Sequence, residues 1–175
     1  TLNTSSDANY AGAISGTGGL IKIGSAIQTF SSSGLMTYSG PTQINEGTFQ
    51  AGVANAFSLN SAVTLSNTFG AILDLNGFDN SIPSLAGGGA NGGNVTLGAK
   101  TLTLTAISGS TTYSGAISGT GGITKTGGST QIFDDSKPNT YTGLTTVAAG
   151  TLELGKIAGL AIPGNVQMDG GTLRL

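Results

Sequence analysis

The sequence predicts an all-β fold, a right-handed parallel β-helix of about eight or nine turns without substantial helix. Three observations carry this prediction. Part of the chain recurs at a fixed offset of 103 residues, and short runs of alternating apolar and polar residues, cut by glycine, follow one another throughout. Only 8% of the residues are charged, whereas 31 are glycine. Repeated short strands are typical of solenoids, in which each turn contacts only its neighbours.

The internal repeat aligns residues 10–65 with residues 113–168 without a gap. The motif Gly-Ala-Ile-Ser-Gly-Thr-Gly-Gly occurs in both copies, and its isoleucine is Ile14 in the first and Ile117 in the second. No linker separates the copies, which favours a single β-helical domain over residues 1–175 rather than two sandwich domains. If the offset spans five turns of roughly 20 residues, Ile14 and Ile117 are both buried in the same sheet, five turns apart.

Strands of three to six residues are expected in order along the chain, because β-branched and aromatic residues alternate with polar ones between Gly and Asn. In the first copy these strands are 20–23, 27–30, 42–44, 48–51 and 62–65, and they recur in the second copy. Between the copies they are 71–75, 81–85, 94–97 and 100–105. Val63 and its counterpart Val166 are expected in the core. No segment has the spacing of an amphipathic helix or the length of an apolar membrane span.

The blocks that the two copies share form an ordered series. In the first copy they are 12–22, 38–42 and 46–49, and in the second they are 115–125, 139–147 and 149–152. This series resembles the autotransporter-associated β-strand repeat and covers about half of the chain. The resemblance implies rungs of a β-helix in the secreted passenger of a bacterial autotransporter, and thus an extracellular or cell-surface location. It also implies a non-catalytic structural stem that helps the passenger to fold during export, with adhesion as an additional role. Neither a signal peptide nor a translocator barrel is recognised, so a passenger segment is expected rather than a whole protein.

The residues that could carry chemistry do not form a set. The chain has neither Cys nor His, so the thiolate ligand and the commonest general base are both missing. The adjacent pair Asp134-Asp135 is interpreted as part of a solvated turn, with calcium or sugar contact as the alternatives. Asp74, Asn76 and Asp79 are spaced like part of a calcium loop but lack its glycine and closing glutamate. We therefore expect no enzyme, no catalytic residue, no metal site and no cofactor.

The remaining motifs favour structural roles. Tyr10, Tyr38, Tyr113 and Tyr141 recur at repeat positions, which indicates a ladder in the core or at a corner rather than a sugar-stacking platform. The alternating threonines of 101–105 suggest the flat arrays of ice-binding solenoids, but such arrays need Thr on successive turns. The glycine-rich stretch 87–93 is interpreted as a surface loop, because strand sequence and not a helix follows it.

Two other classes of function are weighed against the passenger stem. A subunit of an extracellular fibre would stack end to end through open backbone edges. A polysaccharide-acting β-helix enzyme would need several acids along one groove, whereas the eight acids here are scattered. The expected partners are neighbouring turns of a longer parent chain, further copies of the chain end to end, or host or matrix glycans or proteins. Six Lys and Arg residues are too few and too dispersed for nucleic acid.

Overall fold

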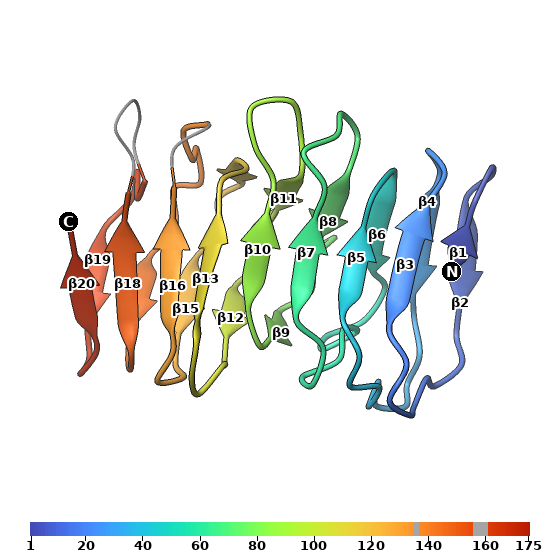
Figure 1. The fold of residues 1–175 in the computed structure, drawn as a ribbon, viewed down its shortest axis with the longest axis horizontal. Coiled ribbons are helices and arrows are strands. Elements are labelled where there is room, and N and C mark those ends of the chain that lie inside the picture. The colour runs from blue at the N-terminus through green and yellow to red at the C-terminus, as the bar shows by residue number, and fades with distance from the viewer. Residues whose placement is uncertain (135–136, 156–160) are drawn as a thin grey trace.

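The computed structural model describes residues 1–134, 137–155 and 161–175, and it arranges them as a parallel β-solenoid of about eight turns. Three parallel sheets, A, B and C, form the coil (Figure 1). The chain passes through all three in the turns from β7 to β15, whereas the described residues of the first turns have strands only in sheets A and B, and those of the last turns only in sheets A and C. The two termini lie toward opposite ends of the stack. No helix occurs among the described residues, and none of them therefore offers a helix that could span a membrane.

The strand bounds within the described residues are as follows. Sheet A holds β1 (Leu2–Asn3), β3 (Leu20–Ile23), β5 (Thr42–Ile44), β7 (Val63–Leu65), β10 (Leu85–Gly87), β13 (Ser110–Tyr113), β16 (Thr130–Phe133), β18 (Thr151–Leu154) and β20 (Thr172–Arg174). Sheet B holds β2 (Ala8–Tyr10), β4 (Ile27–Phe30), β6 (Thr48–Ala51), β8 (Ile72–Asp74), β11 (Asn94–Thr96) and β14 (Ile117–Ser118). Sheet C holds β9 (Asn80–Ile82), β12 (Leu102–Leu104), β15 (Ile123–Lys125), β17 (Thr145–Val147) and β19 (Val166–Met168).

Every strand pair is parallel, and each pairing joins one turn to the next. In sheet A, for example, Lys22 lies beside Ile44, and Ile44 lies beside Leu65. In Figure 1 the strands of sheet A point upward at the front, and the chain then crosses over the top to sheet B while it advances toward the C-terminus. This sense of winding makes the coil right-handed, as predicted.

The core is a stack of apolar side chains between the three sheets. Ile44, Leu73 and Leu102, one from each sheet, are completely buried. Beneath sheet B the rings of Phe30 and Phe49 stack on successive turns with their centroids 4.5 Å apart. Such inward ladders bury apolar surface on every turn, which is the main stabilising contribution in a solenoid.

The two copies of the internal repeat lie in different sheets, which contradicts our expectation. The strands β3, β5 and β7 of the first copy belong to sheet A, whereas their counterparts β15, β17 and β19 belong to sheet C. Likewise β4 and β6 belong to sheet B, and their counterparts β16 and β18 belong to sheet A. The offset therefore spans four and two-thirds turns of about 22 residues, not five turns. A rotation by a third of a turn is tolerated because all three sheets offer a strand the same parallel neighbours above and below.

Equivalent residues of the two copies differ in burial. Ile117 lies in β14 of sheet B and is fully buried, whereas Ile14 lies outside the strands and is only partly buried. Val63 is 2% exposed, but Val166 is 37% exposed. The prediction that all of these residues lie in the core is therefore wrong for Ile14 and Val166. Val166 lies in β19, which pairs with β17 on one side and forms the edge of sheet C within the described residues.

The strand predicted over residues 81–85 is in fact a corner between two strands. β9 ends at Ile82 in sheet C and β10 begins at Leu85 in sheet A, so Pro83 and Ser84 form the bend between them. Proline has no backbone N–H to donate to a ladder, which makes it a suitable residue for a bend. Most of the glycine-rich stretch forms the connection from β10 to β11, in which Ala90 and Asn91 are exposed, as expected of a surface loop, whereas Gly89, Gly92 and Gly93 are buried.

Candidate functional site

Each copy of the repeat builds the same corner around a buried lysine. Lys22 Nζ donates hydrogen bonds to the carbonyl oxygens of Ile23 (3.1 Å), Gly24 (2.5 Å) and Glu46 (3.1 Å). Lys125, its counterpart, donates to the carbonyl oxygen of Gly127. Burial lowers the pKa of both ammonium groups, and the charge of Glu46 partly offsets this effect at Lys22. The carbonyl oxygen of Ile23 also accepts from Thr4 N at 3.2 Å, whereas those of Gly24, Glu46 and Gly127 receive their hydrogen bonds from the lysines, which gives the lysines a structural role.

A glycine completes each of these corners. Gly47 has φ +67° and Gly150 has φ +68°, in the left-handed region that side chains disfavour. A Cβ atom on either would lie 2.3 Å from a carbonyl oxygen of the preceding turn, at Gly24 in the first copy and Gly127 in the second. The shared blocks of the sequence thus encode a corner. In the first copy this corner connects sheet A to sheet B, and in the second copy it connects sheet C to sheet A.

The recurring tyrosines belong to the core, as predicted, apart from Tyr10. Tyr38 and Tyr141 each place their hydroxyl 2.7 Å from a threonine hydroxyl four residues later, and all of these groups are buried. Tyr113 donates to the carbonyl oxygen of Gly93 at 2.7 Å. Tyr10, in the first turn, is 39% exposed and packs edge-on against Phe30. Three of the four rings are therefore inaccessible to a sugar.

These buried tyrosines predict a loss of stability at alkaline pH. Burial raises the pKa of Tyr141 to about 12 and also raises the pKa of Tyr113. In the unfolded chain both hydroxyls titrate near pH 10, so above that pH the native state holds more protons and the free energy of unfolding falls as pH rises. Lys22 and Lys125 oppose this trend, because their pKa values are lowered in the native state.

Urea unfolding of the wild type and of Tyr141→Phe at about pH 8, 10 and 11 measures how much the Tyr141 hydroxyl contributes to this pH dependence of stability. Because phenylalanine cannot ionise, the variant should lose less stability than the wild type between pH 10 and 11. Equal losses in the two proteins would contradict the prediction.

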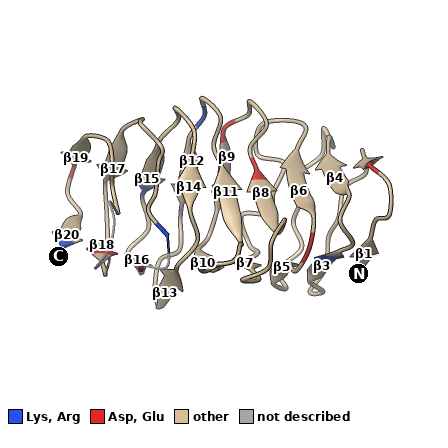
Figure 2. Cartoon of the chain, turned by 90° about the horizontal axis from the view of Figure 1, so that it is seen from above, with Lys and Arg blue, Asp and Glu red and all other residues tan. Residues whose placement is uncertain are grey.

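The carboxylates that the sequence singled out bind neighbouring backbone and side chains. Asp74 accepts hydrogen bonds from Asn76 N and Gln50 Nε2, both at 2.9 Å. Asp79 accepts from Thr101 N at 2.8 Å, on the next turn. Asp135 lies outside the described residues. Figure 2 shows the charged residues scattered along the solenoid, and the described residues contain no group of three His, Cys, Asp or Glu side chains that could hold a metal ion.

One surface feature that the sequence reasoning missed is a row of threonines on successive turns. Thr103, Thr124 and Thr146 lie side by side on the outer face of sheet C, and the row continues to Ser81 at one end and Gln167 at the other. Their spacing in sequence is irregular, so only the strand register reveals the row. It gives the outer face of sheet C an uncharged row of hydroxyl groups that ends in the amide of Gln167.

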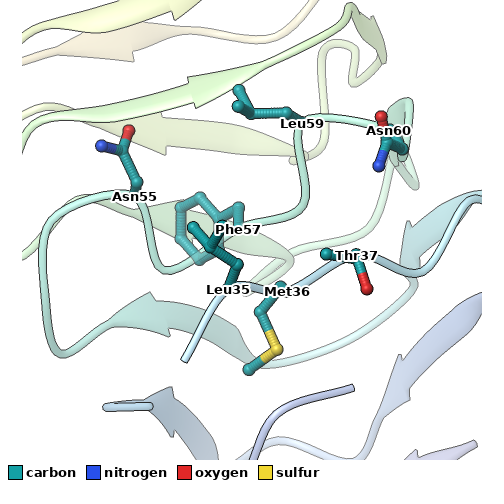
Figure 3. A pocket seen from close by; sticks show the side chains of 7 residues that line it. All are labelled: Leu35, Met36, Thr37, Asn55, Phe57, Leu59 and Asn60. Atoms are coloured by element: carbon teal, nitrogen blue, oxygen red, sulfur yellow. The ribbon is translucent and has the colours of Figure 1, made fainter. Parts of the chain in front are cut away.

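Among the hollows at the corners of the described part of the solenoid are the following three. One, of about 170 Å³, is lined by Leu35, Met36, Thr37, Asn55, Phe57, Leu59 and Asn60, and Figure 3 shows these side chains coming from two segments of the chain. A second hollow shares Leu59 and Asn60 with the first and extends to Pro83 and Ile107. The third lies between sheets A and B, is lined by residues of three successive turns, and includes the carboxylate residue Glu46 and the aromatic residue Phe69. The third hollow thus combines an aromatic ring with a charge.

Comparison with known proteins identifies the repeat. The family model of the passenger-associated-transport-repeat matches residues 20–51 and 123–154. The chain is 38% identical over 176 residues to an adhesin BmaC autotransporter of Brucella suis biovar 1 (strain 1330), an alignment that covers 94% of this chain. The chain spans only 5% of the length of that relative. No solved structure matches.

The matched residues coincide with the structural corners. Each match runs from the strand that carries the buried lysine, β3 or β15, to the strand after the corner glycine, β6 or β18. Residues 20–51 and 123–154 therefore match the passenger-associated-transport-repeat, and this match confirms the predicted resemblance of the chain to the repeats of autotransporter passengers.

Proposed function

We propose that the chain is a segment of the β-helical stem of a surface-exposed autotransporter-type passenger, and that it takes part in adhesion. The observation that carries the proposal is the identity to an adhesin autotransporter over 94% of this chain. The fold supports it, because a parallel solenoid is lengthened by adding turns and presents an extended surface that is suited to binding. The low charge of the chain supports it too, since a surface of Ser, Thr and Asn suits contact with neutral partners.

Surface labelling of intact cells tests the location. An epitope tag inserted between Ser33 and Gly34, two exposed residues of the bend between β4 and β5, leaves the strands intact. Cells that express the full gene containing this segment should bind the antibody without permeabilisation, and added protease should remove the signal. Labelling that appears only after permeabilisation would contradict the passenger role. A tagged cytoplasmic protein in the same cells serves as the control for membrane integrity.

The two rival functions have separate tests on the purified chain. A fibre subunit should grow in light scattering as its concentration rises, because unpaired strand edges associate. A polysaccharide-acting enzyme should release new sugar ends from polysaccharides, and Asp134→Asn should abolish that release. For a stem segment we expect neither strong polymerisation nor release of sugar ends.

A further inference from the structure

The hollow at the corner between sheets A and B brings three polar side chains and one aromatic side chain together from three successive turns. Ser25 lies in the connection from β3 to β4, Glu46 in that from β5 to β6, and Thr68 and Phe69 in that from β7 to β8. The hollow measures about 310 Å³. Phe69 is 90% exposed, so its ring stands in solvent beside the hollow and does not contribute to the core.

The turn that carries Phe69 is held in place by its neighbours. Ala71 N donates to the carbonyl oxygen of Thr68 at 3.1 Å, which closes the turn. The side-chain oxygen of Asn67 accepts hydrogen bonds from the backbone N–H groups of Asn91 (2.8 Å) and Gly92 (3.2 Å) on the next turn. The backbone on both sides of the ring is thus anchored, so ligand binding would lose little conformational entropy at this turn.

The second copy of the repeat shows that the fold does not need these side chains. Its equivalent corner has the same lysine and the same glycine, and it repeats the backbone bonds: Asn45 N to Lys22 O is 2.9 Å, and Ala148 N to Lys125 O is 2.8 Å. At this corner Gly128 replaces Ser25, and Ala149 replaces Glu46.

The connection that carries Phe69, from β7 to β8, also differs from its counterpart in the second copy, from β19 to β20. It spans residues 66–71 in the first copy but only 169–171 in the second, and Phe69 lies in the longer version. The corner around the lysine is therefore built with Ser25 and Glu46 in the first copy and without them in the second, and the loop that carries Thr68 and Phe69 occurs only in the first copy. Because the corner forms either way, the folded structure does not explain their presence.

The charge of the site favours a neutral ligand. One carboxylate oxygen of Glu46 accepts a hydrogen bond from Gly24 N at 3.2 Å, which leaves the other oxygen available. The ammonium of Lys22 lies directly beneath, bonded to the backbone oxygen of Glu46 at 3.1 Å. The two charges offset each other, so a cation would gain little. A calcium ion needs six to eight oxygen ligands, and one carboxylate cannot provide them.

We propose that this corner, formed by Ser25, Glu46, Thr68 and Phe69, binds the ring of a neutral pyranose in a glycan. The exposed face of Phe69 would stack on the sugar's C–H groups, whose partial positive charge matches the negative face of the ring. The available Glu46 oxygen accepts hydrogen bonds from ring hydroxyls, and the hydroxyls of Ser25 and Thr68 both donate and accept. The proposal assigns a ligand class to the proposed adhesive role and rests on that role only for its biological setting.

Nuclear magnetic resonance of the ¹⁵N-labelled chain tests the proposal directly. Methyl β-galactoside, methyl β-glucoside and N-acetylglucosamine are each titrated to about 50 mM, because single-sugar contacts correspond to millimolar Kd values. At least one sugar should shift the amide signals of Gly47, Phe69 and Gly70 in a saturable manner. Phe69→Ala should weaken that binding by about tenfold, and Glu46→Gln should weaken it less. Ile107→Ala removes an equally exposed apolar side chain, 85% exposed, from another corner and should leave binding unchanged.

Three outcomes would overturn the proposal. The first is that none of the sugars shifts these amide signals. The second is that Phe69→Ala binds the sugar as tightly as the wild type does. The third is that n-butylamine shifts the signals while the sugars do not, which would make the corner a cation site. Unchanged amide signals elsewhere in the variants show that they are folded. The result is independent of surface labelling: loss of sugar binding would leave the passenger role intact, and failure of labelling would leave a sugar site on the chain.

Discussion

Val63→Asp is expected to lower the free energy of unfolding by about 3–5 kcal/mol, whereas Val166→Asp should lower it by less than about 1 kcal/mol. The two valines occupy the same position of the repeat but differ in burial, with Val63 at 2% and Val166 at 37% exposure. A carboxylate at Val63 would be enclosed between β5 and β10, the two neighbours of its strand, without a partner for its charge. At Val166 the carboxylate reaches water.

Urea unfolding of both variants measures the difference, and hydrogen exchange locates it. Because solenoid stability is roughly a sum over neighbouring turns, protection in Val63→Asp should fall first in the turns around β7. A uniform loss of protection along the whole chain would contradict the solenoid energetics, and equal destabilisation by the two variants would contradict the burial difference.

Gly150→Ala is expected to cost at least about twice as much stability as Gly77→Ala. Both glycines have positive φ, +68° and +83°, so each substitution carries the left-handed penalty of about 1–2 kcal/mol. A Cβ atom on Gly77 would meet nothing within 4 Å. On Gly150 it would lie 2.3 Å from the carbonyl oxygen of Gly127 and 2.4 Å from that of Ser129, and neither backbone atom can move without opening the corner.

Thermal and urea unfolding of the two variants give the comparison. Gly77→Ala is the matched control for the free-energy cost of placing an alanine in the left-handed backbone conformation. We expect Gly150→Ala to lose at least about 3 kcal/mol. A loss equal to that of Gly77→Ala would mean that the corner relaxes freely and that the glycine of the repeat is not required by packing.

The repeat and the strand pattern determined the fold class. Alternation of apolar and polar residues in short runs predicted strands at 20–23, 27–30, 42–44 and 48–51, and the structure places strands there. This worked because alternation is a local property: successive side chains of a strand point to opposite faces, whatever its neighbours are. The family resemblance rested on the same local blocks, and the lysine and glycine within them define one corner that forms in either copy.

The placement of the strands around the axis depended on the tertiary structure. The number of turns in the offset follows from the length of every turn, and these lengths vary, as the longer turn from β10 through β11 and β12 to β13 illustrates. There β10 and β13 share only the pairing of Gly87 with Tyr113, and the buried amide of Gln131 reaches across two turns to bond the backbone of Leu85. No pattern in the sequence indicates that contact, because it joins residues 46 positions apart.

The candidate binding corner was also invisible in the sequence for a physical reason. Ser25, Glu46 and Phe69 belong to three separate turns and have no common motif. They meet because parallel pairing stacks one turn on the next at about 4.8 Å, so residues roughly one turn apart become neighbours on the surface. Local sequence determined that this chain coils into β-strands, whereas the register between turns decided which of its surface side chains act together.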